Sequence, residues 1–395
     1  MVGERAAAVA RSVLVTMLTT VRASVPGKLI LMGEHAVVYG HPALVTAVDL
    51  RLVAAVTQRP RMTDGGSVTI RATERAGGTL QALELHSTWA DLASYAESVR
   101  ERWERYADAP TAEGFEGVSD DDPAHLIKVA LGEAIAHLLE EPGIIASTDP
   151  PSLTLEVESR IPLGRGMGSS AALAVGVVAG TLAACGPPVA DDVVERIALD
   201  VEKRQHGFPS GVDGSTVLQG GMVWAEPDAR GELQFSRALD RSKLLAAFRV
   251  FDTGPPAEST GTVVEAVRER VEDEPERYRP LLEQMGETTR TFRSELAESE
   301  PEPAAVIACI REYERGLEEL GVVPGEVREL IRKIEAEGGA AKISGAGSLE
   351  STPAGAGCIL IFHPEPSSLD GWAFLRSLRR YDVALGTPGL RLEAA

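Results

Sequence analysis

Cysteine and basic side chains are scarce in this chain of 395 residues. The three cysteines, Cys185, Cys309 and Cys358, lie far apart with no CxxC pair, which argues against structural zinc and favours a reducing, cytoplasmic compartment. Lys and Arg number 39 against 59 Asp and Glu, so the formal net charge is −20. Because this charge repels phosphates, we expect neither a general nucleic-acid partner nor an anionic-membrane surface. Any anionic ligand must be met by local basic groups and backbone amides.

Long apolar runs are also missing, with one exception. Residues 166–190 carry no charge, but Gly and Ser open the segment and Gly-Pro-Pro interrupts it. Its helical part is then roughly 15–17 residues, which is short for a bilayer, so we expect a helix buried on all sides. Residues 1–21 lack an apolar stretch followed by a small-residue cleavage site, so we interpret them as an N-terminal extension.

The remaining composition is that of an ordinary soluble globular protein, with 44% hydrophobic and 25% charged residues. At roughly 150 residues per domain the length allows two or three domains. Long charged helices begin after residue 240, so we place a domain boundary there. The patterns predict strands within 23–56 and at 152–158, 216–221, 222–226, 248–254 and 358–362, and helices at 90–107, 124–141, 171–185, 190–206 and across 258–338.

The strongest local signal is the segment PLGRGMGSSAA at residues 162–172. Gly164, Gly166 and Gly168 let the backbone adopt positive φ, so that several N–H groups can converge on one anion. Ser169 and Ser170 then open a helix whose N-terminus favours phosphate. A tight strand-to-helix turn with a serine cap is the alternative. No GxxxxGK[ST] motif is present, and the segment fits a Rossmann loop poorly.

Three further segments carry residues suited to phosphoryl transfer. SVPGKLILMGEH places Lys28 directly after Pro-Gly, where its charge can neutralise a hydroxyl or a phosphate. In the same segment Glu34 and His35 adjoin, and a surface pair is the alternative there. In EKRQHGFPSGVD, Glu202 lies late on a helix and Asp213 follows a rigid turn that can aim its carboxylate at a hydroxyl, or can be an ordinary turn residue. KISGAG, residues 342–347, is ambiguous between an anion-binding loop and a flexible linker.

In order, spacing and chemistry these four segments resemble the GHMP small-molecule kinase superfamily, and within it the mevalonate kinase family, over residues 22 to 390. The resemblance implies an α+β fold of two domains with the active site between them. Residues 22–240 would form an ATP-binding domain like domain 2 of ribosomal protein S5. Residues 241–395 would form a ferredoxin-like domain. It also implies ATP and Mg²⁺ as cofactors, mevalonate as substrate and a possible homodimer.

The resemblance assigns roles residue by residue. Asp213 would orient or deprotonate the 5-hydroxyl of mevalonate, and Lys28 would lower the pKa of that hydroxyl and stabilise the transferring phosphoryl group. His35 would lie beside the substrate, and Ser170 with Glu202 would hold Mg²⁺. A buried Lys28–Asp213 pair would keep the carboxylate ionised. The residues that would surround the ATP phosphates are Gly164, Arg165, Gly166, Met167, Gly168, Ser169, Ser170, Gly345 and Gly347.

The sequence also departs from the family pattern. SLESTPA, residues 348–354, interrupts the third glycine segment, and either a flap over the phosphates or a looser loop would result. Arg165 replaces a small residue, and we expect it to face solvent. Phosphomevalonate kinase is the nearest alternative, followed by a galactokinase-type sugar kinase, a decarboxylating or 3-kinase relative, and a catalytically silent GHMP-fold binding protein.

Overall fold

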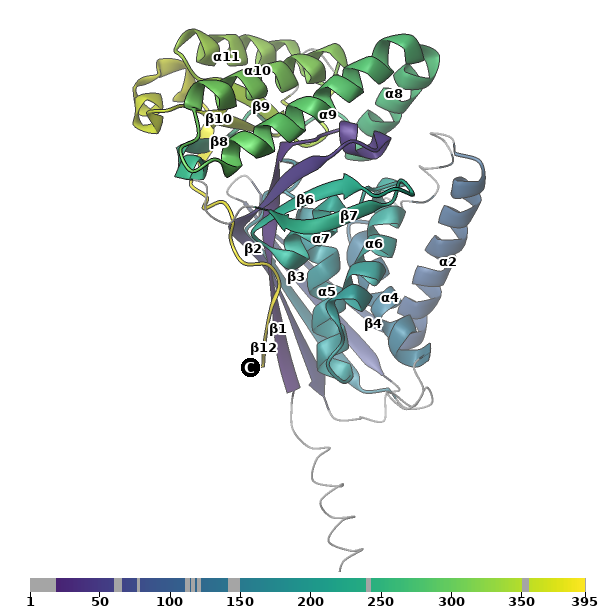
Figure 1. Cartoon of the computed structure of the whole chain (residues 1–395). Coiled ribbons are helices and arrows are strands. Elements are labelled where there is room, and N and C mark those ends of the chain that lie inside the picture. The colour runs from purple at the N-terminus through teal and green to yellow at the C-terminus, as the bar shows by residue number, and fades with distance from the viewer. Residues whose placement is uncertain are drawn as a thin grey trace, which may run out of the picture.

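The computed structural model contains two β-sheets (Figure 1). One cluster of buried apolar side chains includes residues of both sheets. The structure describes residues 19–59, 66–76, 79–110, 114, 118, 122–140, 150–238, 243–349 and 355–394. The first sheet has the order β12-β1-β2-β5-β3-β4, and β6 extends it from β2 and pairs with β7. Neighbouring strands are antiparallel, except that β3 and β5 are parallel. The strands are β1 (Thr19–Met32), β2 (Ala43–Arg59), β3 (Ser67–Ala76), β4 (Thr79–Thr88), β5 (Ser152–Ser159), β6 (Met222–Pro227), β7 (Leu233–Ala238) and β12 (Arg391–Ala394).

The helices between these strands gather on one side of the first sheet (Figure 1). Helix α5 packs directly on β1 and β2, and its Ala-, Val- and Gly-rich sequence is buried nearly all round, as predicted. Gly180 allows this approach, because a Cβ there would lie 3.2 Å from a Val56 methyl group. The helices are α2 (Trp89–Asp108), α4 (His125–Glu140), α5 (Ser169–Cys185), α6 (Asp191–His206) and α7 (Val212–Gln219).

The second sheet is antiparallel, in the order β11-β8-β10-β9, and long helices pack around it. Its strands are β8 (Phe248–Asp252), β9 (Ala340–Ser344), β10 (Cys358–Phe362) and β11 (Arg379–Tyr381). The helices are α8 (Thr260–Asp273), α9 (Pro275–Ala297), α10 (Pro303–Glu319) and α11 (Gly325–Ala336), and short 3₁₀ turns occur at Ala36–Tyr39, Lys243–Ala247, Pro366–Gly371 and Ala373–Leu375. The α+β class with two sheets is therefore confirmed.

Two secondary-structure expectations are wrong. Residues 216–221 were expected to form a strand, but most of them belong to helix α7. Gly211, with φ of 78°, starts this helix, and burial of Val212, Thr216 and Val217 outweighs the strand preference of β-branched side chains. The β3–β4 hairpin was not expected at all, because its strands are rich in polar residues.

The structure describes the predicted domain limits, at residues 21 and 240, only in part. Residues 1–18 of the expected extension and residues 239–242 at the expected boundary lie outside the described residues, while Thr19–Val21 already belong to β1. Strand β12 follows residue 240 in sequence, yet it pairs with β1 in the first sheet. The division of the chain at residue 240 stays a prediction.

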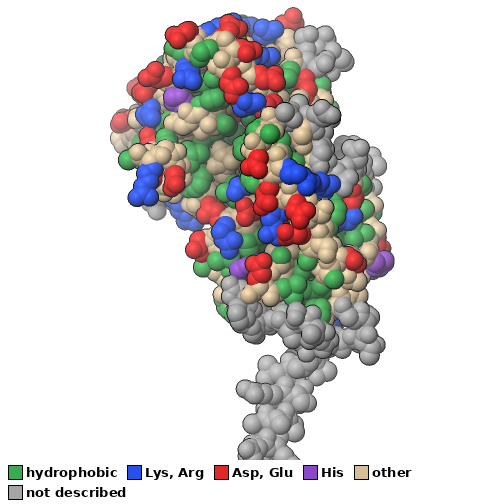
Figure 2. All heavy atoms as spheres, turned by 90° about the vertical axis from the view of Figure 1, so that its right-hand side faces the viewer, with side chains coloured by type: hydrophobic (Ala, Val, Ile, Leu, Met, Phe, Trp, Pro, Cys, Tyr) green, Lys and Arg blue, Asp and Glu red, His purple; other side chains and the backbone are tan. Residues whose placement is uncertain are grey.

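Charged side chains of both signs are interspersed over the face in Figure 2, as far as the described residues show it. Among the described helices none is both long enough and apolar enough to cross a membrane.

Candidate active site

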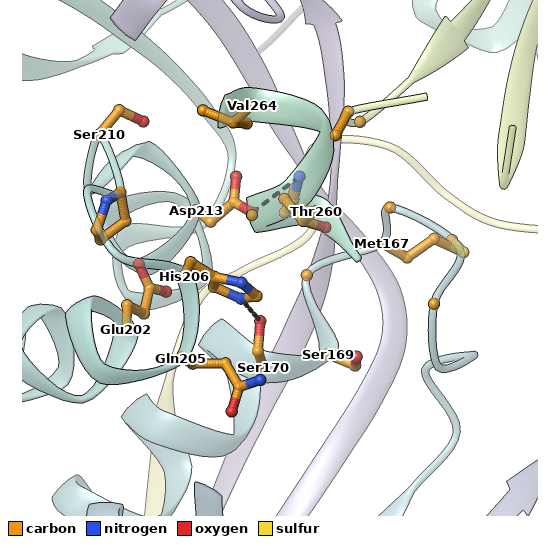
Figure 3. Close-up of a pocket in the computed structure, with 18 of the residues that line it drawn as sticks. Met167, Ser169, Ser170, Glu202, Gln205, His206, Ser210, Asp213, Thr260 and Val264 are labelled. Carbon is orange, nitrogen blue, oxygen red and sulfur yellow. Dashed lines mark hydrogen bonds and ion pairs between the residues drawn. The ribbon is translucent and has the colours of Figure 1, made fainter. Parts of the chain in front are cut away.

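All four segments singled out in the sequence line one cavity of about 540 Å³ (Figure 3). Its lining includes Lys28 from β1, Gly168 from the glycine loop, Asp213 from α7 and Gly345 from the loop after β9. These residues are up to several hundred positions apart in sequence, so only the fold of both sheets assembles them. The volume is in the range of small-molecule sites.

The glycine loop is fixed by close backbone contacts. The Lys28 amide donates to the Met167 carbonyl over 3.0 Å, which ties β1 to the loop. Gly168, with φ of 71°, immediately precedes α5, and the Lys28 side chain crosses it so closely that a Cβ would lie 2.7 Å from Lys28 Cγ. A Cβ on Gly166 would lie 2.2 Å from the Ser344 carbonyl oxygen. The two glycine-rich segments therefore pack against each other, and α5 begins at the cavity.

Lys28 and Asp213 form an ion pair in the cavity, with Nζ and Oδ2 2.9 Å apart. The Lys28 side chain is only 3% exposed, whereas that of Asp213 is 37% exposed. Asp213 lies in the first turn of α7 because Gly211 reverses the chain just before it. This arrangement presents a carboxylate to the cavity with a buried ammonium group behind it.

Glu202 is a buried carboxylate without a hydrogen-bonding partner for its Oε1 atom. Burial and the neighbouring Asp213 raise the pKa of Glu202 to about 8. Such an oxygen is costly to leave unpaired, and a cation held there would compensate it. Ser170 lines the same cavity, so the donor set at this place consists of a hydroxyl and a carboxylate, which are hard oxygen ligands suited to Mg²⁺.

His35 is buried and lines the cavity beside Lys28. Its φ of 57° makes it the one non-glycine with positive φ in the described part of the chain. Its Nε2–H donates to the Ala346 carbonyl over 2.9 Å, since that oxygen can only accept. Burial lowers the pKa of His35 to about 4, so the ring is neutral near pH 7.

Glu34 is buried too, so the alternative of a surface pair for Glu34 and His35 is wrong. The Glu34 carboxylate forms an ion pair with Lys342, and the side chains of both residues are 1% exposed. The Tyr313 hydroxyl donates to the Glu34 carbonyl over 2.9 Å. These contacts attach the turn after β1 to β9 and α10, and with them the two sheets to each other.

Most of the expected site residues line the cavity, and two do not. Arg165 was expected to face solvent, but its guanidinium forms an ion pair with Asp252 of β8 at 2.8 Å, and its side chain is 22% exposed. Gly347 packs against α10's end, where a Cβ would lie 2.1 Å from the Val322 carbonyl oxygen. The expected residues that line the cavity are Lys28, His35, Gly164, Gly166, Met167, Gly168, Ser169, Ser170, Glu202, Asp213 and Gly345.

The cavity also contains residues that the sequence did not single out. His206 is one, and its position four residues after Glu202, on the same helix face, could have revealed it. Leu163 and Phe208 are large apolar side chains left 53% and 47% exposed at this cavity. Asp122, which accepts from the Ala124 amide over 2.8 Å, also lines the cavity. Residues 350–354 of the insertion lie outside the described part of the chain.

Known proteins resemble this chain over most of its length. Residues 126–221 match the family model of the GHMP kinases N-terminal domain. A curated mevalonate kinase of Thermococcus onnurineus is 28% identical over 385 residues, covering 94% of this chain and 98% of the relative. A mevalonate kinase of Mus musculus is 29% identical over 406 residues, covering 94% and 95%.

Solved structures share the fold at lower identity. A mevalonate kinase crystal structure superposes with a TM-score of 0.65 at 18% identity, covering 92% of this chain and 98% of that one. The L. major mevalonate kinase in complex with R-mevalonate superposes with a TM-score of 0.63 at 18% identity, covering 92% and 95%. Residues 126–221 thus match the GHMP kinases N-terminal domain, and the chain as a whole is similar to curated mevalonate kinases over most of its length and shares the fold of solved ones.

Proposed function

We propose that this chain is a mevalonate kinase, which transfers the γ-phosphoryl group of ATP to the 5-hydroxyl of mevalonate. The observation that carries the proposal is the Lys28–Asp213 pair, which faces the same cavity as the glycine loop at the start of α5. Curated mevalonate kinases align with more than nine-tenths of the chain, which supports the same substrate.

The glycine loop and the start of α5 would bind the ATP phosphates. Positive φ at Gly164, Gly166 and Gly168 turns the backbone of the loop, and the N-terminus of α5 favours negative charge. Gly345, also with positive φ, lies against Gly166 and would complete the cradle from the C-terminal part of the chain. The apolar surface of Leu163 and Phe208 would suit the base of the nucleotide.

Ser170 and Glu202 would hold the Mg²⁺ ion that accompanies ATP. The unpaired Glu202 oxygen and its raised pKa fit this role, because a bound cation would restore the charged form of the carboxylate. The ion would neutralise negative charge on the phosphates during transfer of the phosphoryl group.

Lys28 and Asp213 would act on the attacking hydroxyl. The hydroxyl oxygen forms a bond to the γ-phosphorus, the bond to the bridging oxygen breaks, and ADP leaves. Asp213 accepts the hydrogen bond of the hydroxyl, orients it and takes up its proton as the new bond forms, and Lys28 stabilises negative charge on the oxygen and on the phosphoryl group. His35 also lines this cavity, and its neutral ring would contact the substrate.

The charge of the cavity favours mevalonate over phosphomevalonate. Among the described residues of the lining, Lys28 is the one lysine or arginine, and Arg204 is instead buried against Glu133, 3.4 Å away. A phosphorylated substrate would bring at least one further negative charge, and no second cationic group of the described lining would receive it. Structures of phosphomevalonate kinase and galactokinase share the fold and do not decide the substrate.

An assay of ADP release with mevalonate, phosphomevalonate and galactose offered in parallel tests the proposal. We expect turnover with mevalonate alone. Equal turnover with phosphomevalonate would contradict the substrate assignment, and turnover with none of the three would contradict the kinase activity.

We also propose a cytoplasmic enzyme that acts as a homodimer. The three cysteines are free thiols, the state that a reducing compartment maintains. The dimer is expected from the family resemblance alone, and sedimentation velocity of the purified protein tests it.

A further inference from the structure

His206 occupies a fixed place between the proposed metal ligands. It is the last residue of α6, and it lies four residues after Glu202, so both side chains project from the same face of the helix (Figure 3). Its Nε2 atom lies 3.0 Å from the Ser170 hydroxyl oxygen at the start of α5. His206 therefore connects the helix that carries the carboxylate with the helix that carries the hydroxyl.

Two hydrogen bonds hold the backbone immediately after His206. Gly207 ends α6 with φ of 76°, and its amide donates to the Lys203 carbonyl over 2.8 Å. The indole N–H of Trp103 donates to the Gly207 carbonyl over 3.1 Å. Both contacts fix the end of α6, from which the His206 side chain reaches the Ser170 hydroxyl.

A serine hydroxyl has one hydrogen and two lone pairs, and the direction of the hydrogen decides where the lone pairs point. A cation attracts the lone pairs and repels the hydrogen. If the hydrogen of Ser170 is donated to Nε2 of His206, the lone pairs remain available for the cation. The charged groups that act electrostatically on His206 are Asp213 and Lys28, and these two are already paired with each other.

We propose that His206 is a positioning residue that accepts the hydroxyl hydrogen of Ser170 and so turns the serine lone pairs toward the metal ion. The inference rests on the proposed function, since it concerns the ligand set of the proposed Mg²⁺ site. It assigns His206 no contact with mevalonate and no proton transfer to the substrate. Loss of such a supporting hydrogen bond costs on the order of 10- to 100-fold in metal affinity.

The test measures Mn²⁺ binding to the full chain in the presence of ADP, by the loss of the free-ion EPR signal. We expect H206L to bind Mn²⁺ at least about 10-fold more weakly than the unaltered protein. H206Q should recover most of the affinity, because its amide oxygen reaches the position of Nε2. H206N should not, because its shorter side chain reaches only the position of Nδ1.

A double-substitution cycle then separates action through Ser170 from any other effect. If His206 acts through the hydroxyl, S170A combined with H206L binds Mn²⁺ no more weakly than S170A alone. Additive losses would overturn the proposal, and so would a raised KM for mevalonate in H206L with unchanged Mn²⁺ affinity. H86L, in an exposed position of β4, is the matched control and should change nothing.

Failure of this inference differs from failure of the proposed function. If the unaltered protein binds no Mn²⁺ with ADP, the metal site itself is wrong, and the role of His206 is overturned with it. If the unaltered protein binds Mn²⁺ and H206L binds it equally well, only the role of His206 is overturned. Should H206L not fold, as judged by its thermal unfolding, the contrast between H206Q and H206N decides.

Discussion

The Asp213 carboxylate is paired with Lys28 and is also accessible from the cavity. Replacing it by asparagine keeps its size but removes the charge that Lys28 faces at 2.9 Å. We expect D213N to lose at least about 10³-fold in kcat while still binding ATP, because the lost interaction belongs to the transition state. Steady-state kinetics and calorimetric nucleotide binding check this. D370N, at an exposed position, serves as control, and near-normal activity in D213N would refute the mechanism.

Burial of His35 makes the stability of the protein depend on pH. Its pKa falls from about 6.5 in the unfolded chain to about 4 in the folded protein, so the folded state prefers the neutral ring. The stability it contributes is complete above pH 6.5 and is lost as the pH falls from 6.5 toward 4. Between pH 7.5 and pH 5.0 this loss is about 2 kcal/mol in the free energy of unfolding.

Asparagine also tolerates positive φ, so H35N tests the effect with little backbone strain. Urea unfolding of both proteins at pH 7.5 and 5.0 should show a smaller pH dependence in H35N, by about 2 kcal/mol. An identical pH dependence in the two proteins would mean that folding does not lower the pKa of His35.

At the scale of single elements, the junction between the glycine loop and α5 depends on Gly168. An alanine there would combine a backbone cost of about 1–2 kcal/mol with a clash against Lys28. We expect G168A to lose activity much more than stability, because the clash displaces the Lys28 ammonium from Asp213. G231A is a matched control, since Gly231 also has positive φ but open space around it. Equal loss of activity in both variants would show that backbone strain alone matters.

The elements also show where sequence patterns succeed and where they fail. Helix α5 was predictable because its sequence carries no charged residue, so the helix must be buried on all sides whichever elements pack against it. Helix α7 was not, because its short β-branched stretch has no period that separates helix from strand. The polar β3–β4 hairpin carries a weak apolar signal, and its place in the sheet depends on parallel pairing with β5, far along the chain.

For the whole molecule, the buried Glu34–Lys342 pair connects the turn after β1 with the second sheet. K342M should lower the free energy of unfolding by about 3–5 kcal/mol, because it leaves the Glu34 carboxylate buried without its partner. Adding E34Q should recover part of this loss, since the uncompensated charge disappears. Chemical unfolding measures both effects. R277M removes an exposed pair with Glu319 and should change stability by less than about 1 kcal/mol, and an equally small change in K342M would contradict the role of the buried pair.

The sequence by itself determined the buried helix α5 and the chemical kinds of residue at the site, because glycine spacing and charge placement are local properties of a chain. The fold class followed from the resemblance of four sequence segments to the GHMP kinases. Only the tertiary structure decided that His206 contacts Ser170, that Arg165 turns to Asp252, and that Glu34 is buried against Lys342. These contacts join residues from separate helices, strands and loops, most of them far apart in sequence. Their existence depends on how closely the two sheets and their helices pack, which no local pattern records.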